Sequence, residues 1–189
     1  MTTGTLEQTL TTPEAGTWVF DNDHSSIEAV ARHLMVSKVR GRFEEFEGTV
    51  EVGDSLEDSR VEVTIAADSI NTNTPDRDEH LRSGDFLDVE NHPELRFEST
   101  EVRRTGDEEL RVRGDLTIRG ETNEVELDVT YLGLHEDPWG NEKAAFAAQT
   151  TLNREDWGMT WNQALETGGV LVGKELKVEI NVQLQRSES

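Results

Sequence analysis

Apolar and polar residues alternate with a period of two along most of the chain. In residues 176–184, for example, aliphatic side chains share one face, and charged or amide side chains occupy the other. Similar alternation runs through residues 61–65, 110–118 and 124–131. Because successive side chains of a β-strand point to opposite faces, this pattern predicts strands that are buried on one face and solvated on the other.

Further strands are expected near residues 17–21, 25–32, 42–52, 94–104 and 143–153, separated by turns rich in Gly, Asp and Pro. About eight or nine such strands form an antiparallel sheet that must cover its apolar face. Few helices are predicted to cover it, so the pattern favours closure of the sheet into a β-barrel, which also removes exposed edge strands. A two-sheet sandwich is the alternative, since alternation alone does not distinguish the two folds.

Two segments interrupt the alternation. Residues His33–Val39 are expected to form one helical turn after the second strand. Pro75–Phe86 predicts a short helix, because its first turn is acidic and Gly84 suits its C-terminal end. We expect this helix to lie over one mouth of the barrel, with Leu81 and Phe86 directed inward.

The chain is strongly acidic. Its 189 residues include 40 Asp and Glu but only 18 Lys and Arg, a formal net charge of −22. This charge repels phosphate backbones, so nucleic-acid binding is not expected, and standing attachment to an anionic membrane is disfavoured for the same reason. Only four of the basic residues are lysines. An acidic, lysine-poor surface is tolerated in a high-salt cytoplasm, because salt screens the repulsion; an ordinary acidic protein is the alternative.

Cysteine is absent, which excludes disulfides, thiol nucleophiles and zinc–thiolate sites. No apolar run approaches the ~18 residues of a membrane-spanning helix. Residues 1–16 have neither the basic nor the apolar stretch of a secretory signal. We therefore expect a flexible leader over residues 1–16 and a cytoplasmic location.

The histidines show no recognised metal-ligand spacing. His24, His33, His80, His92 and His135 include no H-x-x-x-H pair. The chain also has no nucleophile elbow, phosphate-binding loop or dinucleotide fingerprint. We therefore predict no catalytic residue and no metal site.

Two pairs of neighbours place charged groups beside apolar residues, Arg77-Asp78 and Asn153-Arg154. Two roles are open for them. Asp78 or another acid forms a structural ion pair with Arg154 at one end of the barrel, or an arginine holds the head group of a ligand.

Trp157, Met159 and Trp161 are spaced to share one face of a strand. Two indoles and a thioether either form a deformable surface for a hydrophobic ligand or pack in the core. Gly168-Gly169 follows as a mobile connection. Together with the predicted helix, the segment Trp157–Gly169 is expected to flank a ligand entrance.

An ordered set of short motifs resembles the YceI family of lipocalin-like, polyisoprenoid-binding proteins, from residue 17 to residue 184. The motifs are WVFD at 18–21 with His24-Ser25, HLMVSKVRGRF at 33–43, FEG at 46–48, ADSINT at 67–72, RDEHLRSGDFLD at 77–88, His92-Pro93, FEST at 97–100, GDLTIRG at 114–120 with Thr122, NR-x-DWGM-x-WN at 153–162 and LVG at 171–173.

The resemblance implies an all-β fold over residues 17–186, a single eight-stranded antiparallel lipocalin-like barrel with one short helix near a mouth. It implies a carrier for a long-chain isoprenoid lipid, a polyprenyl or an isoprenoid quinone, with no cofactor beyond that bound lipid. No enzymatic activity is established for the family as a whole. This chain departs at Ala29, where members often carry phenylalanine and where the smaller residue widens the pocket. It also lacks the signal peptide of the exported members, which argues against a periplasmic role.

Strand phase and resemblance together define the expected site. The predicted lipid-binding residues are Ile27, Ala29, Ala31, Val63, Ile65, Leu81, Phe86, Phe97, Leu116, Ile118, Leu127, Val129, Phe146, Trp157, Met159, Trp161, Val178 and Ile180. The same phase directs Val61, Val125 and Val182 inward. The residues expected to bind a head group or to brace the mouth are His33, Arg77, Asp78, His80 and Arg154.

Two other functions stay open. An enzyme acting on a lipid would use His24, His33 or His80 as acid or base. A structural or stress protein would have a barrel filled by side chains and no ligand. A homodimer that covers the lipid mouth is also open.

The charge predicts a salt requirement for stability. Lowering the salt from 1 M to 0.01 M lengthens the Debye length from about 3 Å to about 30 Å, so repulsion among the carboxylates grows. We expect the melting temperature, measured by circular dichroism, to rise steeply with KCl. A flat profile between low and molar salt would exclude adaptation to a salty cytoplasm.

Overall fold

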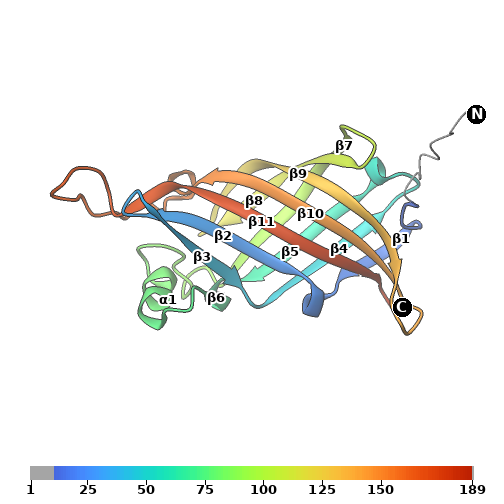
Figure 1. The fold of residues 1–189 in the computed structure, drawn as a ribbon, viewed down its shortest axis with the longest axis horizontal. Helices are drawn as coiled ribbons and strands as arrows, with labels where there is room; N and C mark the ends of the chain where they lie inside the picture. The colour runs from blue at the N-terminus through green and yellow to red at the C-terminus, as the bar shows by residue number, and fades with distance from the viewer. Residues whose placement is uncertain (1–10, 189) are drawn as a thin grey trace, which may run out of the picture.

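The structure, a computed structural model, describes residues 11–188, and most of them lie in antiparallel strands (Figure 1). The strands are β1 (Gly16–Phe20), β2 (Ser26–His33), β3 (Ser37–Phe43), β4 (Phe46–Val52), β5 (Arg60–Ala66), β6 (Ile70–Asn71), β7 (Glu94–Arg104), β8 (Glu109–Ile118), β9 (Glu121–Glu136), β10 (Glu142–Asn153) and β11 (Val172–Arg186). One α-helix is described, α1 (Pro75–Arg82). No helix among residues 11–188 is long and apolar enough to cross a membrane.

The sheet closes on itself. Its hydrogen-bonded order runs β1-β4-β5-β7-β8-β9-β10-β11, and β11 pairs again with β1. Beyond short kinks, β2, β3 and β6 continue β1, β4 and β5, so that β2 also pairs with β11, β3 with β2, and β6 with β3. The fold is therefore the predicted closed eight-stranded antiparallel barrel, and the sandwich alternative is wrong.

Alternation along each strand separates the interior from the surface. In β4, for example, Phe46, Gly48, Val50 and Val52 are buried, while the glutamates between them are exposed. The burial of alternate positions follows from the pleat, which directs successive side chains to opposite faces. The acidic residues therefore lie mainly on the outer wall, where they remain hydrated.

One end of the barrel is filled by aromatic side chains. Trp18 is fully buried, its indole N–H donates to the carbonyl of Glu14 at 2.9 Å, and the Arg186 guanidinium lies over its ring. Tyr131 is also buried there and donates to the carbonyl of Thr11. Burial raises the pKa of Tyr131 to about 12.

The segment before β1 lies against this aromatic end. Pro13 is buried, and the neighbouring main-chain carbonyls accept the two side-chain bonds just described. Residues 11–16 are thus anchored to the barrel, unlike the leader expected there. Residues 1–10, the rest of that expected leader, lie outside the described residues.

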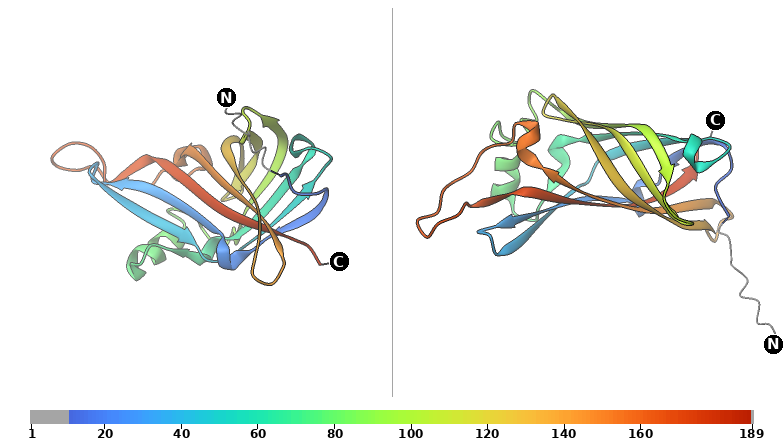
Figure 2. Two further views of the ribbon diagram at one scale, coloured as in Figure 1. Left: turned by 45° about the vertical axis from the view of Figure 1, so that its right-hand side comes forward. Right: turned by 90° about the horizontal axis from the view of Figure 1, so that it is seen from above.

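The opposite end carries the irregular segments. α1, the β2–β3 turn and the connection between β10 and β11 all lie at this end, away from β1 and the end of β11 (Figures 1 and 2). The predicted helix Pro75–Phe86 is present but ends at Arg82, where the main-chain N–H of Ser83 caps it on the carbonyl of His80.

The helical turn expected at His33–Val39 is wrong. β2 continues to His33 and β3 begins at Ser37, and the N–H of Val36 donates to the carbonyl of His33 at 3.2 Å. A tight reverse turn is required here, because β2 and β3 are adjacent antiparallel strands.

A buried carboxylate holds the kink between β1 and β2. Asp21 accepts a hydrogen bond from Lys143 Nζ at 2.9 Å, lies 2.8 Å from Nδ1 of His24 and accepts from the N–H of Asp23. Burial alone would raise the pKa of Asp21, but the hydrogen bonds from Lys143 and His24 outweigh it and lower this pKa below the ordinary value. The ion pair therefore ties β10 to the start of the barrel.

We expect Asp21→Asn to lower the free energy of unfolding by about 1–3 kcal/mol at pH 7, because the buried Lys143 ammonium loses its carboxylate. A depressed carboxyl pKa contributes stability that is present above the unfolded-state pKa and lost as pH falls through the folded-state pKa. The difference between variant and parent, measured by urea denaturation, should thus shrink below about pH 4. Asp23→Asn, at an exposed carboxylate, is the control. Equal effects of the two variants would contradict the assignment.

Candidate lipid-binding cavity

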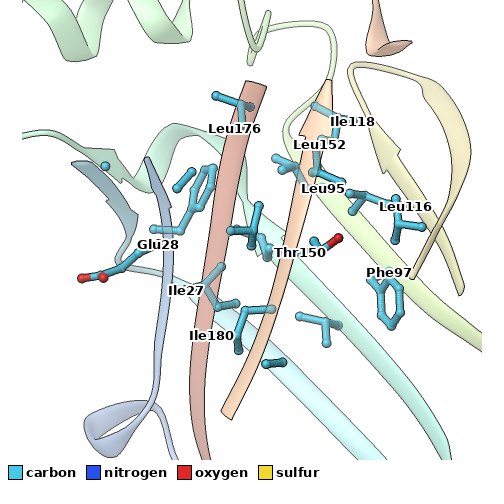
Figure 3. A pocket seen from close by; sticks show the side chains of 18 of the residues that line it. Ile27, Glu28, Leu95, Phe97, Leu116, Ile118, Thr150, Leu152, Leu176 and Ile180 are labelled. Carbon is cyan, nitrogen blue, oxygen red and sulfur yellow. The ribbon is translucent and has the colours of Figure 1, made fainter. Parts of the chain in front are cut away.

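The barrel encloses an apolar cavity of about 680 Å³ that runs from the α1 end toward the aromatic end. All eleven strands contribute side chains to its wall. Figure 3 shows Ile27, Thr150 and Ile180 from three adjacent strands directed into this space, whereas the carboxylate of Glu28 points away from it. The interior is therefore not filled by side chains.

The strand phase places the predicted inward residues correctly. All of the predicted lipid-binding residues except Trp157 line the cavity, as do Val61, Val125 and Val182. Each of them lies on the apolar face of its strand or beside the mouth of the cavity. The alternation of the sequence thus locates the wall of the cavity residue by residue.

Trp157 lies outside the cavity wall, and the shared strand face with Met159 and Trp161 is wrong. Residues Arg154–Trp157 form a short 3-10 helix, η4, which Gly158 ends with a left-handed φ of 78°. The chain direction changes at this glycine, so side chains two residues apart no longer share a face. Trp157 is buried in the core, where its N–H donates to the carbonyl of Leu116 at 3.0 Å.

Trp161 is part of an aromatic cluster at the mouth. Its ring centre lies 4.5 Å from that of His80 and 5.6 Å from that of Phe86, which itself contacts the imidazole edge-to-face at 5.0 Å. His80 Nε2 lies 2.9 Å from a carboxylate oxygen of Asp85. The cluster joins α1 to the η4–β11 connection, so both segments flank the mouth as expected.

Of the predicted head-group or bracing residues, His33, Arg77, His80 and Arg154 line the cavity, whereas Asp78 does not. Asp78 is the buried residue of α1 and accepts hydrogen bonds from the main-chain N–H and the hydroxyl of Thr72. Arg77 also donates to Thr72, to the hydroxyl oxygen at 2.8 Å and to the main-chain carbonyl at 2.9 Å. These contacts fasten α1 to the end of β6.

Arg154 is buried without a carboxylate partner. Its side chain is 2% exposed, and it donates to the carbonyls of Met159, Val172 and Gly173. Among residues 11–188 it forms no ion pair, so the predicted bridge to Asp78 is wrong. Burial lowers the pKa of Arg154, because no buried anion balances its charge.

The three carbonyl bonds leave part of the guanidinium free. A guanidinium carries five N–H donors, and Arg154 uses three of them on main-chain carbonyls of the described chain. Its charged group also lies 5.9 Å from the ring centre of Phe86. Arg154 thus braces the mouth and is itself part of the cavity wall.

Some wall and mouth residues were not among the predicted site residues. Val39 and Phe43 of β3 line the cavity. Because a helical turn was expected at residues 33–39, the inward face of this strand was not predicted. Thr150 adds a hydroxyl on the apolar phase of β10. Arg119, within the quoted motif at 114–120, donates to the carbonyls of Gly84 and Gly158 and so links the two mouth segments.

Residues 11–188 contain no group of three or more His, Cys, Asp or Glu side chains that could hold an ion. His24 is largely exposed beside Asp21 and does not line the cavity.

The comparisons with known proteins agree with this geometry. The model of the YceI-like domain matches residues 18–184. The chain belongs to the YceI family. A Staphylococcus aureus (strain N315) protein, UPF0312 protein SA2479, is 42% identical over 174 residues, which cover 90% of this chain and 98% of that protein.

Solved structures of YceI-like barrels share the fold. Burkholderia cenocepacia BcnA superposes with a TM-score of 0.75 at 19% identity, covering 87% of this chain and 98% of BcnA. A Saccharophagus degradans domain, described as polyisoprenoid-binding and implicated in plant cell wall breakdown, gives a TM-score of 0.67 at 11% identity, covering 90% of this chain and 98% of that domain. At these identities the likeness establishes the barrel, and the wall residues of this chain define its own cavity.

We expect Arg154→Ala to lower the free energy of unfolding by about 3 kcal/mol or more, because three carbonyls at the mouth lose a charged donor. Arg113→Ala is the matched control, since this half-exposed arginine pairs only with surface glutamates and should cost less than about 1 kcal/mol. Urea denaturation of both variants checks the difference. Similar small losses in both would show that Arg154 does not brace the mouth.

Proposed function

We propose that this protein is a carrier that holds one long-chain isoprenoid lipid, a polyprenyl or an isoprenoid quinone. The tail lies in the barrel cavity and the head group lies at the α1 end. The observation that carries this proposal is the continuous apolar cavity of about 680 Å³ inside a closed barrel. The polyisoprenoid-binding description of the related Saccharophagus degradans domain is consistent with it.

The size and chemistry of the cavity fit a slender hydrocarbon tail. At about 30 Å³ per water-sized group, the volume has room for roughly two dozen such groups, or a tail of roughly four to five isoprene units. Each buried methylene contributes about 0.8 kcal/mol, so the tail binds without specific polar contacts. A longer tail would leave part of its length outside the mouth.

The polar residues at the α1 end fit an oxygen-bearing head group. The cavity wall at this end includes Thr72, Thr74, Arg77 and Arg154, whereas the wall near the aromatic end offers the Ser59 hydroxyl, which has no hydrogen-bond partner among the described residues. A head-group oxygen near Arg154 would accept hydrogen bonds from guanidinium N–H groups that bond no carbonyl. Such an oxygen would offset the buried charge of Arg154. The arrangement therefore favours insertion of the tail first.

We further propose that the protein binds its lipid without chemical turnover. His80, the imidazole best placed at the mouth, is held between two aromatic rings and Asp85. His80→Gln would then retain lipid binding. Turnover of a presented lipid that is lost in this variant would instead support an enzyme.

The direct test is organic extraction of the purified protein followed by mass spectrometry. A polyprenyl or quinone species that co-purifies in stoichiometric amount is the expected result. An extract free of isoprenoids, combined with no uptake of a fluorescent isoprenoid, would overturn the proposal.

A pair of adjacent alanines on β10 separates cavity binding from surface effects. Ala148 lines the cavity, and Ala147 lies on the opposite face of the same strand. We expect Ala148→Phe to weaken binding of a fluorescent isoprenoid about tenfold or more, because the ring displaces at least two methylenes worth about 0.8 kcal/mol each. Ala147→Phe should leave the affinity unchanged. Equal affinities of the two variants would place the ligand outside the barrel.

A further inference from the structure

Three consecutive apolar side chains are exposed at the tip of the β2–β3 hairpin. Leu34 is 44% exposed, Met35 56% and Val36 81%. Of the other large apolar residues recorded as exposed in residues 11–188, Leu132 and Trp139, neither adjoins another. Single exposed apolar residues are common, whereas a contiguous apolar tip calls for a partner that covers it.

The backbone at this tip favours different residues. Leu34 and Met35 have positive φ values of 55° and 63°, the sign that a type I′ turn requires at both central positions. Asn and Gly adopt this conformation readily, whereas longer side chains do so at a cost in energy. Turn geometry therefore does not account for the apolar side chains, and strain of this kind is a signal of function.

The tip lies at the rim of the cavity mouth. The N–H of Leu34 donates to the carbonyl of Leu171 at 2.8 Å, so the turn is joined to the connection between β10 and β11. His33, which precedes the donor Leu34, and the acceptor Leu171 both line the cavity. The turn and this connection project together from the α1 end of the barrel (Figures 1 and 2).

The charge around the tip is opposite to that of the whole chain. Residues 29–43 contain four basic residues and no acidic one, in a chain with a net charge of −22. Arg40 of this set pairs with Glu28 and Glu179, and residues 158–171 of the adjacent connection carry one exposed acid, Glu166. Arg32 and Lys38 face each other in the hairpin register, are exposed, and form no ion pair among residues 11–188. At physiological salt the Debye length is about 8 Å, so a surface near the tip is affected mainly by these cations and little by distant carboxylates.

We propose that the β2–β3 tip docks the protein transiently on an anionic lipid bilayer. Leu34, Met35 and Val36 enter the region between head groups and acyl chains, and Arg32 and Lys38 contact the anionic head groups. Docking brings the cavity mouth to the membrane, where a lipid tail passes between the bilayer and the barrel. This inference rests on the proposed function for the passage of lipid, but the docking itself does not.

The far end of the barrel shows why a bilayer fits this tip in particular. Trp139 is 83% exposed in the β9–β10 hairpin, but its neighbours are Glu136, Asp137 and Glu142. An anionic surface repels that hairpin and attracts the basic β2–β3 tip. The net charge of −22 then opposes standing attachment, so the protein leaves the membrane after exchange.

The test is co-flotation of the full-length protein with vesicles of phosphatidylcholine alone or of phosphatidylcholine with about one-third phosphatidylglycerol. It is carried out at about 0.15 M KCl, where the Debye length is about 8 Å, after the native circular dichroism spectrum has been confirmed at this concentration. We expect the protein to bind the anionic vesicles, and to bind the neutral ones about tenfold or more weakly. The reason is that each basic residue near an anionic surface raises the affinity about fivefold. No binding, or equal binding to both, would overturn the proposal.

The double variant Leu34→Asn, Met35→Gly separates docking from folding. Asn-Gly suits positive φ at both positions, so the melting temperature should stay equal or rise, while vesicle binding falls about tenfold or more. Val36→Ser, outside the strained pair, should weaken binding with no change in melting temperature. Trp139→Ser at the far end should change nothing. Retained vesicle binding in both tip variants would overturn the proposal.

The cavity variant distinguishes failure of docking from failure of the carrier function. Ala148→Phe should still float with anionic vesicles but should not remove a fluorescent isoprenoid from them. The tip variants should bind this isoprenoid in detergent solution as the parent does, yet extract it from vesicles about tenfold more slowly. If the parent floats but takes up no isoprenoid, docking stands and the carrier function fails. If it takes up isoprenoid but never floats, docking fails alone.

Discussion

The pairing of β11 with two different strands is the interaction on which the cavity depends. Near its end β11 pairs with β1, and over most of its length it pairs with β2. Between these ladders the N–H of Asp21 donates to the carbonyl of Gln183. Without this closure the sheet would have two open edges and a single apolar face, which would collapse or associate with another chain. Closure lets the main chain, rather than side-chain packing, keep the interior open.

An open apolar interior has an energetic consequence. Side chains that line a cavity lack dispersion contacts on one side, and a ligand that fills the space restores them. The aromatic end, closed by Trp18 and Tyr131, gives a tail no polar partner beyond the Ser59 hydroxyl. The mouth is therefore where recognition of a head group and exchange with the surroundings take place.

Arginine side chains hold the mouth together through main-chain carbonyls. Arg82 bonds the carbonyls of Asp68 and Ile70, Arg119 joins the α1 side to the η4 side, and Arg154 binds the start of β11. Loops carry few apolar contacts of their own, so multiple charged donors on carbonyls give them a defined position. These bonds use no carboxylate, so the acidic residues remain hydrated on the outer wall. The β2–β3 tip is a separate, locally basic surface.

The sequence by itself determined most of the strands and their inward faces, because a period of two depends only on local geometry. Alternation left a sandwich open beside the barrel, and the pairing of β11 with β1 decided closure. Residues such as Leu127 and Ile180 could be placed on the cavity wall before any contact was known. The YceI motifs added the family. The tertiary structure decided what long-range contacts control: the turn at residues 34–36, the position of Trp157 in the core and the carbonyl partners of Arg154. Alternation gives no information on chain reversal at a left-handed residue, or on which distant carbonyl a guanidinium reaches. Both depend on segments that only folding brings together.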